Sequence, residues 1–174
     1  MTLTPVNAGW IEVICGSMFS GKTEELIRRL RRAQIAQMSI AIFKPKIDSR
    51  FSEGHIVSHN HIKMESHIID EPNDILDIAK EHEVIGIDEA QFFDNSLINT
   101  CKELANSGKR VVVAGLDKDY RGLPFGPMPT IMCEADYLDK LRAICVKCGN
   151  PASYTQRTSS DSGQVVIGEL DKYE

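Results

Sequence analysis

The sequence predicts an α/β fold with a mainly parallel sheet that carries helices on both faces. Short apolar runs rich in β-branched residues alternate with amphipathic stretches along most of the chain. The runs are apolar on both faces, as is typical of strands buried inside a parallel sheet. A glycine-rich turn joins the first run to the first amphipathic stretch, which favours the same α/β arrangement.

The individual elements follow from these patterns. The apolar runs predict buried strands at Trp10–Cys15, Ser39–Lys44, Val84–Asp88 and Arg110–Leu116. The amphipathic stretches between them predict helices at Thr23–Ala36, Asn73–His82 and Asn95–Asn106. Because helices separate the strands in the chain, the strands are expected to lie parallel.

The character of the sequence changes after Pro129, and a domain boundary is expected near residue 140. The segment YLDKLRAIC (137–145) resembles a strand that leads into a turn at CVKCGNPA, and SYTQR (153–157) would form the second arm. The polar segment Thr158–Gln164 is rich in Gly and Ser and predicts a loop. We therefore expect a main domain over residues 1–140 and a small subdomain over residues 141–174.

Composition and charge exclude several classes of protein. The 42% hydrophobic and 26% charged content is typical of a soluble globular domain. A net charge of −5 argues against a nucleic-acid partner. The basic cluster Arg28–Arg32 is interpreted as a solvated helix face, with contact to a polyanion as the alternative. No apolar run approaches the length of a membrane span, which is about 20 residues. Of the five cysteines, three are scattered singly and two form one close pair, which is not a secreted disulfide pattern, so a cytoplasmic location is expected.

A phosphate-binding loop follows the first predicted strand. GSMFSGKT (16–23) matches G-x-x-x-x-G-K-[ST] at every fixed position. Backbone amides of such a loop point at phosphate oxygens, and the following helix adds its N-terminal dipole. Lys22 is expected to reach the β- and γ-phosphates and Thr23 to bind Mg²⁺. The candidate ATP-binding residues are Gly16, Ser17, Met18, Phe19, Ser20, Gly21, Lys22 and Thr23; an ordinary glycine-rich turn is the alternative.

Two carboxylates lie at the carboxyl end of the third predicted strand, in VIGIDEAQFF (84–93). In a parallel sheet this strand end lies beside the phosphate loop. Asp88 suits a magnesium ligand, and Glu89 suits a base that accepts the proton of the group attacking the γ-phosphate. Ala90 and Gln91 complete this ATP-binding segment. Glu89 could instead cap a following helix, and DEAQ also resembles motor ATPases, so water and a substrate hydroxyl both remain possible acceptors.

Missing motifs narrow the reaction. The sequence contains no Asn-Lys-x-Asp element for guanine, no second motor domain and no protein-kinase motif set. A GTPase, a helicase and a protein kinase are therefore disfavoured.

Seven ordered segments carry a family resemblance: GSMFSGKTEEL, KPKIDSR, VIGIDEAQFF, VVVAGLDKDYRGLPFGPM, CVKCG, ASYTQR and VVIGELDKY. In this order they resemble the thymidine kinases of the bacterial, cytosolic-animal and poxvirus type (type II), over nearly the whole chain. The resemblance implies a RecA-like P-loop NTPase core followed by a zinc-ribbon and lasso subdomain. It also implies transfer of the γ-phosphate of ATP to the 5′-hydroxyl of thymidine, giving dTMP for DNA synthesis. A nucleoside-independent ATPase or a nucleotide-switched binding module is the alternative.

The resemblance assigns roles to single residues. Glu89 is the expected general base and acts with Lys22 as the catalytic pair. Asp48, Arg50 and Arg157 are expected on the triphosphate side. The residues expected around thymidine are Met18, Phe92, Leu116, Tyr120, Thr155, Gln164, Val166, Gly168 and Tyr173. Phe92 and Leu116 could equally be plain core residues, because apolar strand ends usually are.

Cys145-x-x-Cys148 is typical of a zinc knuckle, which is half of a tetrahedral site. The resemblance implies a second ligand pair after the lasso, so half of the zinc ligands are expected outside this chain. Alternatively Cys133 or a histidine completes the site, or the pair is vestigial or disulfide-linked. His55, His59 and His61 are interpreted as part of a polar loop rather than a second metal site. A homotetramer and feedback inhibition by dTTP are further implications of the resemblance.

Overall fold

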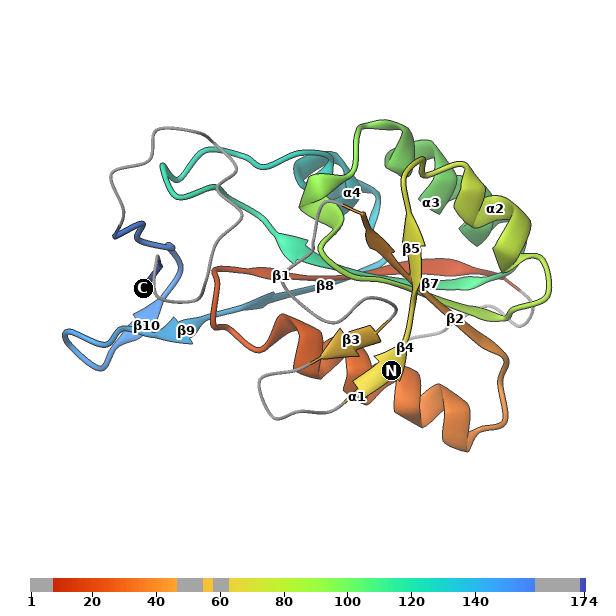
Figure 1. The fold of residues 1–174 in the computed structure, drawn as a ribbon, viewed down its shortest axis with the longest axis horizontal. Coiled ribbons are helices and arrows are strands. Elements are labelled where there is room, and N and C mark those ends of the chain that lie inside the picture. Colours follow the sequence, from red (N-terminus) through yellow and green to blue (C-terminus); the bar gives the residue numbers. More distant parts are fainter. Residues whose placement is uncertain (1–7, 47–54, 58–62, 159–172) are drawn as a thin grey trace.

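A computed structural model describes residues 8–46, 55–57, 63–158 and 173–174 of the chain. Within them six strands form one parallel sheet in the order β5-β2-β6-β7-β1-β8 (Figure 1). Their bounds are β1 Trp10–Gly16, β2 Ile40–Pro45, β5 His67–Ile69, β6 Val84–Ile87, β7 Arg110–Leu116 and β8 Tyr137–Leu141. The predicted α/β fold with a mainly parallel sheet is confirmed.

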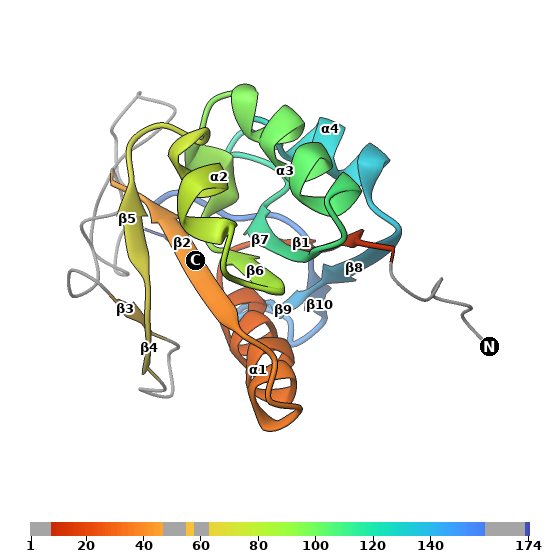
Figure 2. The ribbon, with the colours of Figure 1, turned by 90° about the vertical axis from the view of Figure 1, so that its right-hand side faces the viewer.

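Helices cover both faces of the sheet. Figure 2 shows α1 on one face and the other three helices on the opposite face. Their bounds are α1 Lys22–Ile35, α2 Asp74–Ala79, α3 Ser96–Asn106 and α4 Met128–Glu134, and a 3-10 turn, η1, spans Ala90–Phe92. The strands run apolar on both faces because each face meets a helix layer.

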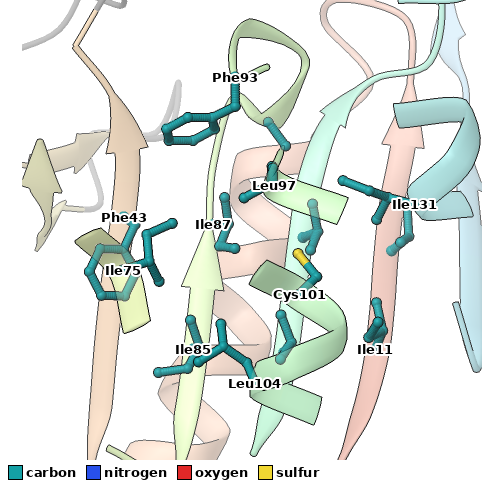
Figure 3. Packing of buried hydrophobic residues seen from close by; sticks show 14 of the residues in the cluster. Ile11, Phe43, Ile75, Ile85, Ile87, Phe93, Leu97, Cys101, Leu104 and Ile131 are labelled. Atoms are coloured by element: carbon teal, nitrogen blue, oxygen red, sulfur yellow. The ribbon is translucent and has the colours of Figure 1, made fainter. Parts of the chain in front are cut away.

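Two apolar clusters form the core, one on each face of the sheet. The larger cluster lies under α2, α3 and α4, and its side chains interdigitate around Ile87, Leu97 and Leu104 (Figure 3). The smaller cluster lies under α1 and includes Leu26, Leu30 and Val112. Helix α1 packs closely, since a Cβ on Gly86 would lie 2.7 Å from Leu30 Cδ1. The two clusters fix the sheet between the helix layers.

Two short antiparallel pairs stand outside the main sheet. β3 (His55–Val57) pairs with β4 (Lys63–Glu65), where the sequence predicts a loop. β9 (Ala143–Ile144) pairs with β10 (Pro151–Ala152), and this hairpin extends from the end of the sheet near the C-terminus (Figure 1). The turn between β9 and β10 contains Cys145 and Cys148.

The structure corrects the predicted hairpin. Residues 137–141 are not a hairpin arm, because they form β8 and pair in parallel with β1, Glu12 opposite Tyr137 through Gly16 opposite Leu141. The second arm is Pro151–Ala152 and not SYTQR. Three successive residues of β8 are exposed and two of them, Asp139 and Lys140, are charged, which resembles an exposed hairpin. An edge strand tolerates such residues because one of its sides meets solvent.

Arg29 corrects the interpretation of the basic cluster as a solvated face. Arg28, Arg31 and Arg32 are exposed, but Arg29 is buried. Its guanidinium donates to Glu25 and Glu12, both at 2.8 Å, and pairs with Asp139 of β8. Arg29 therefore joins α1 to the edge strand. No helix in the described part of the chain is long and apolar enough to cross a membrane.

Candidate functional site

The phosphate loop curls tightly between β1 and α1. Gly16 has φ 145° and Gly21 has φ 85°, and Phe19 is left-handed at φ 61°. A Cβ on Gly16 would lie 2.3 Å from Leu141 O, so only glycine fits between β1 and β8. Inside the loop, Ser17 O accepts hydrogen bonds from Lys22 Nζ at 2.7 Å and Ser20 Oγ at 2.8 Å. Both hydrogen bonds end on the Ser17 carbonyl oxygen, and they close the loop.

Lys22 sits at the base of this loop among acidic groups. Burial lowers the pKa of Lys22, and the nearby carboxylates of Glu89, Asp88 and Asp117 act in the opposite direction, in that order of strength. Two of these carboxylates follow β6 and the third follows β7. The carboxyl ends of adjacent parallel strands therefore meet at the lysine, as the sequence predicts for Asp88 and Glu89.

Thr23 and Asp88 lie close enough to share a cation. Thr23 Oγ1 donates to Asp88 Oδ2 at 3.2 Å, and Asp88 Oδ1 accepts the Glu89 backbone N–H at 3.0 Å. The Asp88 N–H in turn donates to Phe43 O at 2.9 Å, which fixes the end of β6 against β2. A hydroxyl and a carboxylate are hard oxygen ligands of the kind Mg²⁺ prefers, so this pair fits the predicted magnesium site.

Glu89 adopts an unusual backbone conformation at the head of η1. Its φ and ψ are 52° and 39°, in the left-handed region. A non-glycine residue there costs of order 1–3 kcal/mol and tends to occur at functional sites. Its side chain accepts a hydrogen bond of 2.5 Å from Gln91 Nε2. The conformation directs Glu89 toward the phosphate loop, where its charge acts on Lys22.

Gln91 holds Glu89 to the sheet. Only 2% of Gln91 is exposed, and its Oε1 accepts the Leu116 N–H of β7 at 3.0 Å. Gly115 leaves room for this contact, since a Cβ there would lie 2.9 Å from Gln91 Oε1. Ala90 is fully buried in the larger core cluster. The side chains of these two predicted ATP-binding residues thus pack inside the protein and support the neighbouring Glu89.

Aromatic side chains gather beyond η1, where the resemblance implies the nucleoside. Phe92 meets Phe125 edge to face with ring centroids 5.7 Å apart. The Arg157 guanidinium stacks 3.6 Å from the Tyr120 ring centroid, and its Nη2 donates to the Tyr173 hydroxyl at 3.1 Å. The structure thus places Arg157 in an aromatic cluster with two predicted thymidine-binding residues.

The C-terminal segment contacts the phosphate loop directly. Thr155 Oγ1 accepts the Met18 N–H at 3.0 Å, and Ser17 Oγ donates to Ala152 O at 3.3 Å. Leu116 ends β7 opposite Gly16 and is half-buried. The structure therefore brings together the loop, the end of β7 and the predicted nucleoside residue Thr155. Five further predicted site residues lie outside the described residues: Asp48, Arg50, Gln164, Val166 and Gly168.

Backbone hydrogen bonds close the turn that contains Cys145 and Cys148. Cys145 N donates to Asn150 O and Gly149 N to Cys145 O, each at 2.8 Å, with Gly149 at φ 72°. Backbone N–H groups of Cys148 and Lys147 lower the pKa of the Cys145 thiol, and the Cys148 side chain lowers it further. Both thiols are free, so they are not linked as a disulfide here. The described residues contain no group of three or more His, Cys, Asp or Glu side chains able to hold a metal ion.

Sequence reasoning missed Asp117 and its partner Lys140. Asp117 is 5% exposed, and its Oδ2 lies 2.6 Å from Lys140 Nζ in β8. A signal was present, because Asp117 directly follows β7 just as Asp88 directly follows β6. The pairing with Lys140 depends on β8 lying beside β1, which the sequence pattern does not reveal.

Comparisons with known proteins agree with this geometry. The thymidine kinase family model matches residues 9–174. A thymidine kinase of Rhodothermus sp. (strain ITI 518) is 56% identical over 168 residues, which is 97% of this chain and 79% of the relative. A thymidine kinase of Bdellovibrio bacteriovorus is 51% identical over 167 residues, 95% of this chain and 82% of the relative. Domain III of the Thermotoga maritima replication initiation protein DnaA is similar only at TM-score 0.44 and 17% identity, over 76% of this chain and 55% of that one.

The family model matches almost the whole chain, and a relative is identical at more than half of the aligned residues. The structure also places two strand-end carboxylates beside the phosphate loop. The chain belongs to the thymidine kinase family.

Proposed function

We propose that the chain transfers the γ-phosphate of ATP to the 5′-hydroxyl of thymidine, giving dTMP, with Glu89 as the general base. One observation carries the assignment of the base. Glu89 accepts a hydrogen bond from Gln91 at 2.5 Å and directly follows Asp88 in the chain. Asp88 accepts a hydrogen bond from the Thr23 hydroxyl at 3.2 Å. A carboxylate beside the metal ligands is placed to accept a proton from the attacking hydroxyl.

The nucleotide side of the site is built from the phosphate loop. Its backbone amides and Lys22 would bind the β- and γ-phosphates, and Thr23 with Asp88 would hold Mg²⁺. Bound Mg²⁺ supplies positive charge that bridges phosphate oxygens and offsets the charge that develops on them. Asp48 and Arg50 complete this side of the proposal. Lys22 lies among the strand-end carboxylates, and its Nζ donates to Ser17 O of the phosphate loop at 2.7 Å.

The proton of the 5′-hydroxyl would pass to Glu89. Gln91 donates to Glu89 Oε2 and so holds the carboxylate in a fixed orientation. Proton transfer to a positioned base contributes about 10²–10⁴-fold to a rate. Because the deprotonated oxygen attacks in line with the leaving ADP, Glu89 must lie on the nucleoside side of the phosphate loop.

Thymine would lie among the aromatic residues beyond η1. Phe92, Leu116, Tyr120 and Met18 would enclose the ring, and Thr155 would lie beneath it. Gln164, Val166, Gly168 and Tyr173 would cover the base largely through main-chain hydrogen bonds. Enclosing the base excludes water, which favours transfer to the nucleoside over hydrolysis of ATP.

Zinc is proposed as a structural metal at the cysteine knuckle. The Cys145 and Cys148 thiols lie on one turn, and backbone N–H groups stabilise the Cys145 thiolate, so the pair fits one half of a tetrahedral site. The remaining two ligands would lie outside the described residues. The metal would stiffen hairpin β9–β10, from which the segment with Thr155 continues.

Assembly and regulation extend the proposal. The family resemblance supports a homotetramer that acts in the cytoplasm and is inhibited by dTTP. The net charge of −5 supports small-molecule substrates rather than a nucleic-acid partner.

Release of ADP tests the proposed reaction. Purified protein with Mg²⁺ and ATP should release ADP only slowly, and addition of thymidine should raise the rate steeply with equimolar dTMP. The control is 5′-deoxythymidine, which keeps the base but lacks the acceptor hydroxyl and should not raise ADP release. An equal rate without any nucleoside would instead support the ATPase alternative.

A further inference from the structure

An ion pair crosses the strand that leads into the phosphate loop. Asp117 directly follows β7 and Lys140 belongs to β8, while β1 lies between these two strands. In the register, Cys15 is opposite Lys140 and Gly16 is opposite Leu116. Strands two positions apart lie about 10 Å from one another, so the 2.6 Å contact between Asp117 Oδ2 and Lys140 Nζ passes over β1 at its last residues.

The surroundings of the pair are buried on the Asp117 side. The Asp117 side chain is 4% exposed and the Lys140 side chain is 45% exposed. Cys15 lies beneath the pair: burial and the Asp117 carboxylate raise the pKa of its thiol to about 11, and Lys140 and Lys22 act in the opposite direction. A small side chain at Cys15 and none at Gly16 leave space for the crossing. The pair is therefore not an ordinary surface salt bridge, which contributes little to stability.

Each end of the pair carries part of the proposed nucleoside site. Asp117 begins the loop 117–125, which closes on itself through Phe125 N to Asp117 O at 3.2 Å and has Tyr120 near its tip. Lys140 lies near the end of β8, from which the chain continues through hairpin β9–β10 to Thr155 and Arg157. Figure 1 shows the loop after β7 and this hairpin extending from the same end of the sheet.

The two parts also meet at their far ends. The Arg157 guanidinium stacks on Tyr120 at 3.6 Å, and Thr155 Oγ1 accepts the Met18 N–H of the phosphate loop at 3.0 Å. Arg157 thus joins the C-terminal segment to the Tyr120 loop, and Thr155 joins the same segment to the phosphate loop. Asp117 and Lys140 connect the residue that begins the Tyr120 loop with the strand that leads to the C-terminal segment. The second carboxylate oxygen, Asp117 Oδ1, is buried without a hydrogen-bond partner among the described residues, a costly arrangement that points to a role for this carboxylate beyond stability.

We propose that Asp117 is a positioning residue for the nucleoside, which acts through Lys140 to hold the Tyr120 loop and the Thr155 segment at a fixed separation around the phosphate loop. This inference rests on the proposed function. Asp117 and Lys140 themselves need not touch the nucleoside. Breaking the pair would loosen the nucleoside site while the phosphate loop, which has its own hydrogen bonds, stays formed.

Steady-state kinetics of Asp117→Asn and Lys140→Met test the inference. Each variant should raise KM for thymidine about tenfold, equivalent to about 1.4 kcal/mol, while kcat and KM for ATP stay within about twofold. The double variant should raise the KM for thymidine no further than either single variant, because both substitutions break the same contact. Lys140→Arg keeps the positive charge, so its KM for thymidine should stay near that of the wild type.

Lys102→Met is the matched control. Lys102 has the same side-chain exposure as Lys140, 45%, and pairs with Glu134 at 2.9 Å on the far helices α3 and α4. Its loss should leave both KM values unchanged.

Three results would overturn the inference: an unchanged thymidine KM in Asp117→Asn, an equal rise in both KM values, or additive effects in the double variant. Because Lys140→Met leaves a buried carboxylate unpaired and could prevent folding, Asp117→Asn and Lys140→Arg carry the test by themselves. A calorimetric measurement of thymidine binding distinguishes failure of this inference from failure of the proposed reaction. A wild type that binds thymidine without turnover contradicts the reaction alone, and the variants then test the inference by their Kd. A wild type that does not bind thymidine overturns both.

Discussion

Replacement of Gln91 separates the stability of the site from its activity. Gln91 donates to Glu89 Oε2 at 2.5 Å and accepts the Leu116 N–H at 3.0 Å, and it is 2% exposed. Gln91→Leu removes both bonds. A hydrogen bond to a charged group contributes about 1.5–3 kcal/mol, and an unsatisfied buried N–H costs about 1–3 kcal/mol. The free energy of unfolding should therefore fall by roughly 2.5–6 kcal/mol, a loss of about 5–24 °C in Tm for a chain of this size.

Gln91→Glu is the matched variant. It keeps an acceptor for Leu116 N–H but replaces the donor to Glu89 with a second carboxylate. Two carboxylates at this distance do not both ionise readily, so Glu89 is a poorer base. We expect a smaller loss of Tm than in Gln91→Leu but a fall in kcat of about a hundredfold, within the range that a general base contributes.

Differential scanning fluorimetry and a coupled ADP assay measure these two effects. Gln91→Leu should lose both stability and activity, and Gln91→Glu should lose mainly activity. If Gln91→Glu turned over thymidine at the wild-type rate, Gln91 would not be what holds Glu89 in place. An unchanged Tm in Gln91→Leu would contradict the account of its buried hydrogen bonds.

Two further predictions concern acid stability and the metal. Hydrogen bonds from Arg28, and from Arg29 to a lesser degree, lower the pKa of Glu25 from 4.5 to about 2. The ionised Glu25 carboxylate therefore stabilises the fold above pH 4.5, the pKa of Glu25 in the unfolded chain, and this stabilisation is lost as pH falls toward 2. The Tm difference between wild type and Glu25→Gln should shrink between pH 4.5 and about 2. A Tm difference that stays constant over this range would contradict the prediction. Elemental analysis should find zinc that Cys145→Ser or Cys148→Ser removes and Cys133→Ser retains, since Cys133 lies outside the knuckle. Equal zinc in all three variants would refute the assignment.

Much of the fold could be predicted because its strands and helices carry strong periodic patterns. β7 was predicted with its observed bounds, Arg110–Leu116, and β1 and β2 within one residue at each end. β5 was missed because three residues, His67–Ile69, give too short a pattern to detect. α4 was missed because it begins at Met128-Pro129, and a proline in the first turn of a helix resembles a break.

The site could be predicted where one local motif determines it. The loop 16–23 is one continuous segment, and Asp88 and Glu89 are adjacent residues. The parallel sheet brings these two motifs together. Contacts between distant segments have no such local signal. Arg29 with Asp139, Met18 with Thr155 and Asp117 with Lys140 all depend on where β8 and the segment after it lie. The left-handed backbone of Glu89 was also not predictable, since no glycine marks it.

The most direct test measures turnover and ATP binding in Glu89→Gln, with Lys22→Ala as the comparison. Removing the carboxylate while keeping the side-chain shape should reduce dTMP formation by about 10²–10⁴-fold, yet leave the Kd for ATP nearly unchanged. Lys22→Ala should weaken ATP binding as well as turnover, because Lys22 belongs to the phosphate loop. Wild-type turnover in Glu89→Gln would show that another group accepts the proton of the 5′-hydroxyl.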